Sequence, residues 1–502
     1  MVAARTISII VLSFGLFAGS TSGQATLINN GPDGEKLVFA VLGDGYAAAD
    51  LQKYHDDVDR LVVHGVFEHD FYRDNQRAFN VYRMDLTSTE SGVSTPEGKK
   101  DTALKTVFTG TWDTQWIRET PVETDRLINA AVARLGRKVN YVFVVLNESG
   151  WGGVQRGDRM YVTSGIDWAV VAHEYGHGIG GLADEYTGAD VDTPAAYSGE
   201  CVNSLNVSTV LDRDKVVWKA LIKPETPVPT DCSAPGFNCN TTVGMFKGAS
   251  YADTKIYRPV ENCRMRTNTP AFCPVCRAIM DEAVRDYLGP EQAAAPAGAS
   301  NERPAPPPAA DAPPANAPPA NAPPGNAPPG NAPPGTAKPA DSYVMMVLHM
   351  SQDGTTEVVS AEEFQGRLVQ KSRATSPFIA ALTDRGVPAV VQPLPQDPFI
   401  VRGFTDEANR KGEKVERAKQ ATVIVHIPRE RIAGIAPERL GVAVYKVDAG
   451  VPEERISPAM VKRLKDENKL TSYLVSKPNT VGPQLDQKIK AAREVRDREN
   501  PK

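Results

Sequence analysis

The sequence has no cysteine before Cys201, so the N-terminal 200 residues contain no site for a disulfide or for a lipid attached to cysteine. Residues 1–5 precede an apolar run from Ile7 to Ala18, and small residues follow it. This pattern is typical of a signal peptide, so we expect residues 1–24 to be removed and the protein to be secreted or periplasmic. Because no cysteine lies near the expected cleavage site, we expect no lipoprotein anchor there.

Long apolar runs and strong charge of one sign are also missing. No later segment reaches the roughly 18 apolar residues of a spanning helix, so we expect a soluble mature protein without stable membrane insertion. The 56 lysines and arginines nearly balance the 61 aspartates and glutamates, which gives a net charge of −5 over 502 residues. Without a basic cluster, this balance gives no case for nucleic acid as a partner.

Histidine is scarce, and its positions narrow the possible metal sites. The histidines are His55, His64, His69, His173, His177, His349 and His426. The run H-E-Y-G-H begins at His173, in a segment that reads as a helix. Residues four apart lie on one helix face, so the imidazoles of His173 and His177 can bind one metal ion. Glu174 lies beside that metal, where it can accept a proton from water.

The residues around this motif predict where the helix begins and ends. Trp168–Ala172 is apolar and would bury the helix in a core. Ser164 and Asp167 precede it with the spacing of a capping box. Gly180 and Gly181 then end the helix, because glycine readily adopts the left-handed conformation of a C-terminal turn. The chain can therefore turn back toward the metal.

A third ligand is needed, because a catalytic zinc usually has three protein ligands and one open position. The histidine positions exclude a third histidine from the following loop. In the metzincin pattern H-E-x-x-H-x-x-G-x-x-H, Gly180 matches the glycine, but Ala183 occupies the last position. We predict that Asp184, one residue later, is the third ligand, with Glu185 as the first alternative. Glu200 is disfavoured, because its neighbours do not read as a second helix.

Other stretches accompany this motif and resemble a known family. The string continues as G-L-A-D-E-Y, and the other stretches are Val41–Tyr46, Thr89–Gly92, Gly152–Gly153, Tyr257–Pro259, Asn262–Arg266 and Phe272–Cys276. In order and number these motifs resemble the bacterial metallopeptidase family whose founding member cleaves immunoglobulin A. The resemblance covers roughly residues 28 to 288 and implies a zinc endopeptidase of the metzincin type. It does not establish immunoglobulin as the substrate, because specificity depends on pockets.

The resemblance also implies roles for residues near the C-terminal end of this region. Metzincins carry a methionine in a tight turn beneath the zinc, and Met265 is the expected residue. Tyr251 and Tyr257 lie just before it, and their hydroxyls, or that of Tyr186, can stabilise the oxyanion formed when water attacks a peptide carbonyl. For any one of these tyrosines, a packing role is the interpretation that we favour.

The cysteines lie in one stretch of the chain: Cys201, Cys232, Cys239, Cys263, Cys273 and Cys276. An even, clustered set in an exported protein favours up to three disulfides. The run Cys273-Pro-Val-Cys276 is also compatible with a redox pair or with half of a structural zinc site. The sequence does not decide which cysteines pair.

Residues 25–288 are predicted to form the peptidase domain, of the α+β class, with a mixed sheet and the H-E-x-x-H helix. We expect strands at Lys36–Leu42, Phe79–Met84 and Tyr141–Leu146. We expect helices at Asp50–Val63 and Val122–Leu135. Arg159–Thr163 alternates in polarity and precedes the metal helix, so we expect an edge strand. Such an edge can bind a substrate peptide by strand addition.

The rest of the chain is predicted to be modular. Residues 289–340 are rich in Ala, Pro, Asn and Gly and predict an extended linker. Residues 341–480 predict a small β-rich accessory domain that docks a substrate or the cell envelope, with a charged tail at 481–502. Its strands are expected at Tyr343–Met350, Ala421–Ile427 and Leu440–Val447. We therefore expect a chain that ends near Pro290 to fold and act alone.

These features together predict a secreted, Zn²⁺-dependent endopeptidase with a protein or peptide as its substrate. Zinc on His173, His177 and Asp184 would polarise the scissile carbonyl and acidify its water. Glu174 would take the proton of this water and later deliver it to the leaving amine. One alternative is a zinc hydrolase of a non-peptide amide, such as a cell-wall bond. Another is an inactive protein-binding scaffold, against which the intact Glu174 argues.

Overall fold

The computed structural model describes residues 23–108, 122–150, 152–187, 204–232, 238–239, 241–289, 341–404, 414–477 and 479–499. The expected signal peptide, except its last two residues, lies outside these ranges. So do Glu200, Cys201 and almost all of the expected linker. The domain limits given above therefore stay predictions. Within the described ranges, no helix has both the length and the apolar character to cross a membrane.

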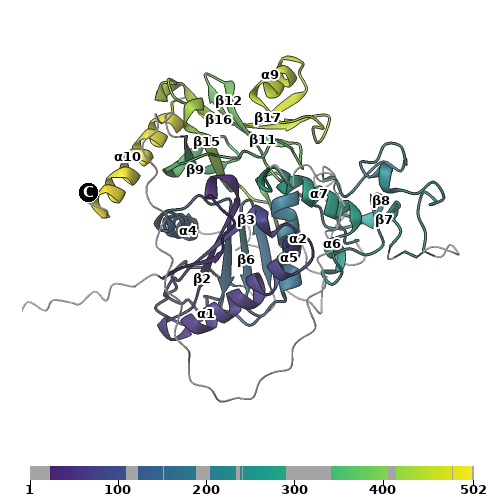
Figure 1. Ribbon diagram of the computed structural model, residues 1–502, viewed down its shortest axis with the longest axis horizontal. Coiled ribbons are helices and arrows are strands. Elements are labelled where there is room, and N and C mark those ends of the chain that lie inside the picture. The colour runs from purple at the N-terminus through teal and green to yellow at the C-terminus, as the bar shows by residue number, and fades with distance from the viewer. Residues whose placement is uncertain are drawn as a thin grey trace, which may run out of the picture.

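The protein is of the α+β class and is built around a mixed sheet with the strand order β1-β3-β2-β4-β6-β5-β13-β14 (Figure 1). The strands are β1 (Gln24–Ile28), β2 (Leu37–Asp44), β3 (Phe79–Met84), β4 (Tyr141–Leu146), β5 (Gly153–Arg156), β6 (Arg159–Thr163), β13 (Ile400–Phe404) and β14 (Lys414–Arg417). The central strands β3, β2, β4 and β6 run parallel. Every residue of β2 is buried, as expected for a parallel strand covered on both faces.

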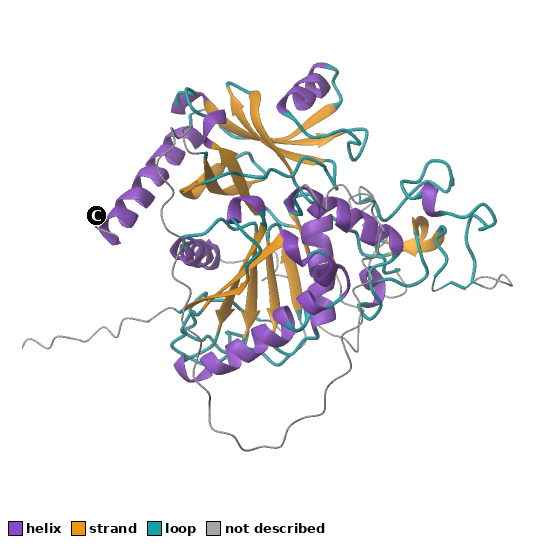
Figure 2. Ribbon diagram, in the orientation of Figure 1, coloured by secondary structure: helices purple, strands orange, loops and turns teal. Residues whose placement is uncertain are grey.

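Helices cover both faces of this sheet (Figure 2). The helices of the N-terminal half are α1 (Leu51–Val58), α2 (Asp70–Asp74), α4 (Val122–Leu135), α5 (Trp168–Tyr175), α6 (Arg264–Thr267) and α7 (Pro274–Val284). Phe39 and Val41 of β2 pack in one apolar cluster with α1, α5 and α7. Val38 and Leu42 point to the other face, where they share a cluster with α4. Side chains alternate between the two faces along β2, so α5, the helix that carries His173, and α4 lie on opposite faces of the sheet.

Shorter elements connect these helices and strands. A hairpin of β7 (Phe246–Ala249) and β8 (Ala252–Arg258) forms a separate two-stranded sheet. The remaining turns of helix are η1 (Asp33–Glu35), η2 (Ala48–Asp50), η3 (Asp59–Val63), η4 (Val66–Glu68), η5 (Gln76–Ala78), η6 (Gly176–Gly180), η9 (Lys219–Leu221) and η10 (Arg285–Tyr287).

The C-terminal half contains two further antiparallel sheets, β10-β9-β15 and β12-β11-β16-β17. Their strands are β9 (Ser342–Ser351), β10 (Thr356–Gln365), β11 (Phe378–Asp384), β12 (Val387–Pro393), β15 (Gln420–Pro428), β16 (Leu440–Val447) and β17 (Leu470–Val475). The helices are η12 (Arg429–Arg431), η13 (Pro437–Arg439), α9 (Pro458–Asp466) and α10 (Val481–Glu499). The expected charged tail is thus largely α10, and its residues Val481, Leu485 and Ile489 are buried in the core of this half.

The two halves share one sheet and one apolar cluster, which the sequence did not predict. Strand β13 pairs antiparallel with β5, from Val401 opposite Arg156 to Phe404 opposite Gly153. Met345 of the C-terminal half lies in the same apolar cluster as strand β4 and helix α4. The N-terminal half therefore has one apolar cluster of its own and a second one that the C-terminal half completes.

The same pairing corrects the prediction for Arg159–Thr163. This segment is the strand β6, as expected, but it lies between β4 and β5 and has no free edge. β5 is covered in turn by β13. A substrate peptide cannot add to β6, because both sets of its backbone groups are already paired.

Candidate active site

The metal helix begins and ends at the residues that its flanking sequence indicates. Asp167 is the N-cap, and its carboxylate accepts a hydrogen bond of 2.7 Å from the amide of Ala169. Helix α5 contains His173 and ends at Tyr175, and the chain continues without a break as the π-helical turn η6. Gly181 then adopts a left-handed conformation with φ of 65°. This turn sends the chain back toward the histidines.

The side chains of His173, His177 and Asp184 converge on one point. The two Nε2 atoms are 3.1 Å apart, and Oδ1 of Asp184 lies 3.1 Å from each of them. None of the three residues is more than 2% exposed. Their ligand atoms are close enough together to hold one metal ion.

Backbone carbonyls orient both imidazoles. Nδ1 of His173 lies 2.9 Å from the carbonyl oxygen of Arg264, and Nδ1 of His177 lies 2.7 Å from that of Leu182. A carbonyl oxygen can only accept, so each Nδ1 carries the proton and each Nε2 presents a lone pair. Two such lone pairs and a carboxylate directed at one point form a donor set that fits a cation.

Asp184 is held in its charged form and in position. Burial opposes its ionisation, but the imidazoles of His177 and His173 keep the pKa of its carboxyl well below the usual range. The hydroxyl of Tyr251 donates a hydrogen bond of 2.6 Å to Oδ2, which leaves Oδ1 directed at the histidines. Tyr251 has a φ of 65°, a conformation that non-glycine residues rarely adopt, in the turn between β7 and β8.

Glu174 is buried in α5, next to His173, and is 1% exposed. Burial lowers the pKa of His173, but hydrogen bonding to Asp184 and the negative charges of Asp184 and Glu174 together raise it. A buried carboxylate adjacent to one candidate ligand in the same helix is a candidate to exchange a proton with water at a metal held there.

The turn that carries Met265 packs against the metal helix. Met265 is fully buried, and a Cβ atom on Gly176 would lie 2.8 Å from its sulfur and 3.1 Å from the ring of Phe272. The glycine inside H-E-Y-G-H thus leaves room for the close approach of the Met265 and Phe272 side chains. The preceding residue, Arg264, supplies the carbonyl that orients His173.

The first alternative ligand, Glu185, and the other tyrosines lie elsewhere. Glu185 Oε1 accepts hydrogen bonds from Asn206, at 3.1 Å, and from the thiol of Cys276, at 3.2 Å. It therefore does not join the histidines. The ring of Tyr186 lies 5.9 Å from that of His173, and Tyr257 pairs with Lys247 in the β7–β8 hairpin. The contact between Tyr251 and Asp184 was not foreseen, because only the folded hairpin brings them together.

The C-terminal half reaches the end of the metal helix. The ammonium of Lys371 donates a hydrogen bond of 3.2 Å to the carbonyl oxygen of Ile179 in η6. A Cβ atom on Gly181 would overlap the carbonyl oxygen of Pro395. Burial lowers the pKa of Lys371 to about 8. The turn that follows His177 is therefore packed from outside the N-terminal half.

Replacing Asp184 with alanine is expected to lower metal content as much as His177→Ala does. The double variant should lose no more than either single variant, because both residues would serve one site. Glu185→Ala should leave the metal of the histidine site in place, since groups behind the ligands typically change affinity by about 10–100-fold. Metal analysis of the purified variants tests this, and an unchanged metal content in Asp184→Ala would exclude it as a ligand.

The family model described as IgA peptidase M64 matches residues 25–241 and 236–284 of the chain. The matched ranges contain the converging side chains of His173, His177 and Asp184, together with Glu174 and Met265. They end before the C-terminal half. A search of curated proteins finds no match.

Proposed function

The chain belongs to the IgA peptidase M64 family, and from this premise we propose that it is a secreted zinc endopeptidase of the metzincin type. Family membership indicates a metallopeptidase that acts on protein or peptide substrates. The observation that carries the finer proposal is the convergence of His173, His177 and Asp184, with Glu174 adjacent to His173 in the same helix. We propose these three residues as the metal ligands and Glu174 as the general base.

The donor set supports zinc and a catalytic role. Two imidazole nitrogens and one carboxylate suit zinc, and three protein ligands leave a fourth position open, as in catalytic rather than structural sites. When bound, zinc would supply Lewis acidity for the scissile carbonyl and for the attacking water. The carbonyl partners of both Nδ1 atoms keep the imidazoles in the tautomer that can bind a metal.

The protein's own groups would then move the protons. The carboxylate of Glu174 takes a proton from the attacking water and later delivers it to the nitrogen of the leaving amine. Tyr251 holds Asp184 and so acts as a positioning residue rather than as a free oxyanion donor. The exported location and the docking role of residues 341–480 remain predictions from the sequence. The contacts of Lys371 and Pro395 support a further role for this half, in holding the metal helix.

Incubation with an unfolded protein, such as denatured casein, tests the proposal. We expect cleavage into peptides, loss of this activity after treatment with a chelator, and recovery on addition of Zn²⁺. Removing the metal should lower the rate by at least about 10²-fold, since the residual site would keep only the base. Mass spectrometry of the products identifies the cleaved bonds.

The same preparation separates the two alternatives. A zinc hydrolase of a non-peptide amide would leave casein intact and release fragments from purified cell wall, in a chelator-sensitive way. An inactive scaffold would bind metal and cleave neither substrate. Either result from a fully metal-loaded protein would contradict the endopeptidase proposal.

A further inference from the structure

A second group of buried metal-binding side chains lies next to the candidate active site in the sequence. The sulfurs of Cys263, Cys273 and Cys276 and a carboxylate oxygen of Glu185 all lie within 4.8 Å of one another. Sulfurs on a tetrahedral zinc are about 3.8 Å apart, given zinc–sulfur bonds of about 2.3 Å. Cys273 is 6% exposed and the other three are fully buried. The four groups are therefore close enough to share one ion in a closed site.

These three cysteines are thiols in the part of the chain that the structure describes, and backbone amides donate hydrogen bonds to two of their sulfurs. The amide of Cys273 donates to the sulfur of Cys263 at 3.3 Å, and that of Cys276 donates to the sulfur of Cys273 at 3.4 Å. Cys273 is also the N-cap of α7, an 11-residue helix. Amide donors and a helix N-terminus both favour the thiolate, which is the form that binds metal.

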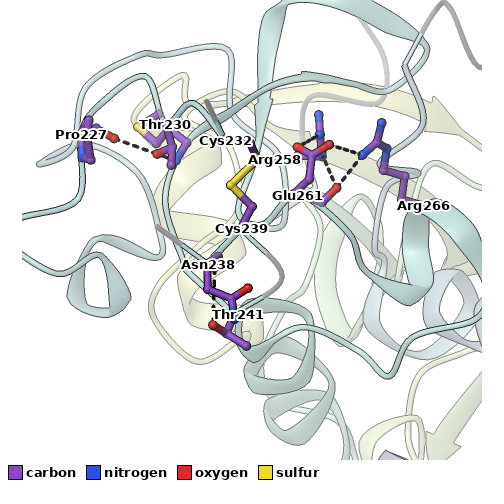
Figure 3. The surroundings of a disulfide bond; sticks show 10 residues. Pro227, Thr230, Cys232, Asn238, Cys239, Thr241, Arg258, Glu261 and Arg266 are labelled. Atoms are coloured by element: carbon purple, nitrogen blue, oxygen red, sulfur yellow. Dashed lines mark hydrogen bonds and ion pairs between the residues drawn. A yellow bond between two sulfur atoms is a disulfide. The ribbon is translucent and has the colours of Figure 1, made fainter. Parts of the chain in front are cut away.

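Glu185 supplies an independent indication of a cation-binding site. It is fully buried, and its Oε2 has no hydrogen-bond partner among the described residues. Arg258, whose charge acts on Glu185, instead forms an ion pair with Glu261 (Figure 3). A buried carboxylate is costly unless it is paired or binds a metal.

Disulfide formation among the cysteines that the structure describes does not account for this cluster. The described disulfide joins Cys232 and Cys239, away from these residues in the sequence (Figure 3). It confirms one of the up to three disulfides that the sequence favoured. Three sulfurs around one point cannot all pair with one another, and a disulfide would not satisfy the carboxylate of Glu185. A metal ion satisfies all four groups at once.

We propose that Cys263, Cys273, Cys276 and Glu185 bind a second, structural zinc ion. Three thiolates and one carboxylate would complete a tetrahedron with no position for water, as in structural zinc sites. Sulfur-rich sites of this kind select zinc over harder cations. This proposal does not rest on the peptidase activity, because none of these residues is a proposed catalytic ligand.

The position of the cluster indicates that this metal would stabilise the segments that carry the candidate ligands. Glu185 follows Asp184, and its amide donates a hydrogen bond of 2.7 Å to the carbonyl oxygen of Met265. Cys263 precedes Arg264, whose carbonyl orients His173. The structural zinc would therefore join the Met265 turn, the start of α7 and the loop of Asp184. The histidine site should still hold its own metal when this zinc is lost, with an affinity lowered by about 10–100-fold at most. Glu185→Ala should therefore lose the structural ion alone.

Cobalt substitution in the full-length protein tests the proposal. Thiolate ligands give cobalt(II) an intense near-ultraviolet charge-transfer absorption, whereas the histidine site has no thiolate. We expect about two metal ions per chain, given that each site binds one, and the charge-transfer band in both wild type and His177→Ala. Cys276→Ser should lose the band and about one ion. The matched control Cys232→Ser/Cys239→Ser should keep both.

A measurement on the wild type covers the case in which Cys276→Ser does not fold. A mercurial reagent added to the zinc-loaded protein should displace about one zinc ion per chain, detected with a chromogenic chelator, because it competes for thiolates. The proposal is overturned if no charge-transfer band forms with the thiols reduced. It is also overturned if the mass of the unreduced protein shows a disulfide among the three cysteines. A band in a protein without peptidase activity would leave the structural zinc standing and refute the proposed function alone.

Discussion

Glu174→Gln is expected to abolish peptide hydrolysis while the metal remains bound. Glutamine has nearly the same size as glutamate, but its amide cannot accept and return a proton. Loss of a positioned general base costs about 10²–10⁴-fold in rate, and the cost is larger where one group serves in two steps. The measurement is kcat/KM on a fluorogenic peptide, with metal content determined on the same sample.

Glu357→Gln is the matched control for this variant. Glu357 is exposed on β10 in the C-terminal half, so the same chemical change there should leave both turnover and metal content unchanged. If Glu174→Gln carries a full complement of metal and still cleaves at a nearly normal rate, Glu174 is not the base.

A chain shortened to end near Pro290 is expected to be insoluble or unfolded, contrary to the modular arrangement that the sequence suggested. The deletion removes β13 and leaves β5 as an unpaired edge, which invites aggregation. It also uncovers the face of the sheet against which Met345 packs, and each apolar side chain exposed costs roughly 1.5–3 kcal/mol. Soluble yield, thermal unfolding and metal content, compared with the full-length protein, measure the effect.

Co-expression with residues 341–499 supplies the control for this truncation. Added in trans, this half should restore the solubility and metal content of the shortened chain, because the shared sheet and core can form again. If the shortened chain alone is monomeric, binds metal and cleaves a short peptide at the full-length rate, the shared core is dispensable.

Local patterns in the sequence predicted individual elements well. The strands Phe79–Met84 and Tyr141–Leu146 and the helix Val122–Leu135 have the expected bounds. Asp167 caps the metal helix, and Gly181 ends it in a left-handed conformation. In each case the signal lies within a few residues of the element, as alternation, helical spacing or cap chemistry.

The pairing of strands that are far apart in the chain could not be predicted from such local patterns. Alternation identifies β6 as a strand, but it does not say which strands lie beside it, and the cover of β5 comes from β13, far along the chain. Helix α10 was predicted as a charged tail, because its many charged residues obscured a buried stripe. Val481, Leu485 and Ile489 are spaced by four, which is the signal that could have identified its packed face.

In the candidate site, too, the features with a local sequence signal were predicted and those that depend on distant segments were not. The spacing of His173 and His177 and the returning Asp184 were evident from the sequence, and the structure places them together. The contact of Tyr251 depends on a hairpin from a distant segment, so no local pattern indicates it. The even cysteine count favoured disulfides, whereas the fold gathers three cysteines around Glu185.

The most direct test of the central claim is a digestion in heavy-oxygen water. The claim is that Glu174, beside a metal on His173, His177 and Asp184, activates water to cleave peptide bonds. The metal-loaded protein should convert a varied mixture of unstructured peptides into products whose new carboxyl termini each carry one heavy oxygen. These products should be absent after chelation and with Glu174→Gln. A metal-loaded wild-type protein that yields no such termini, or a Glu174→Gln variant that yields them equally, would contradict the account.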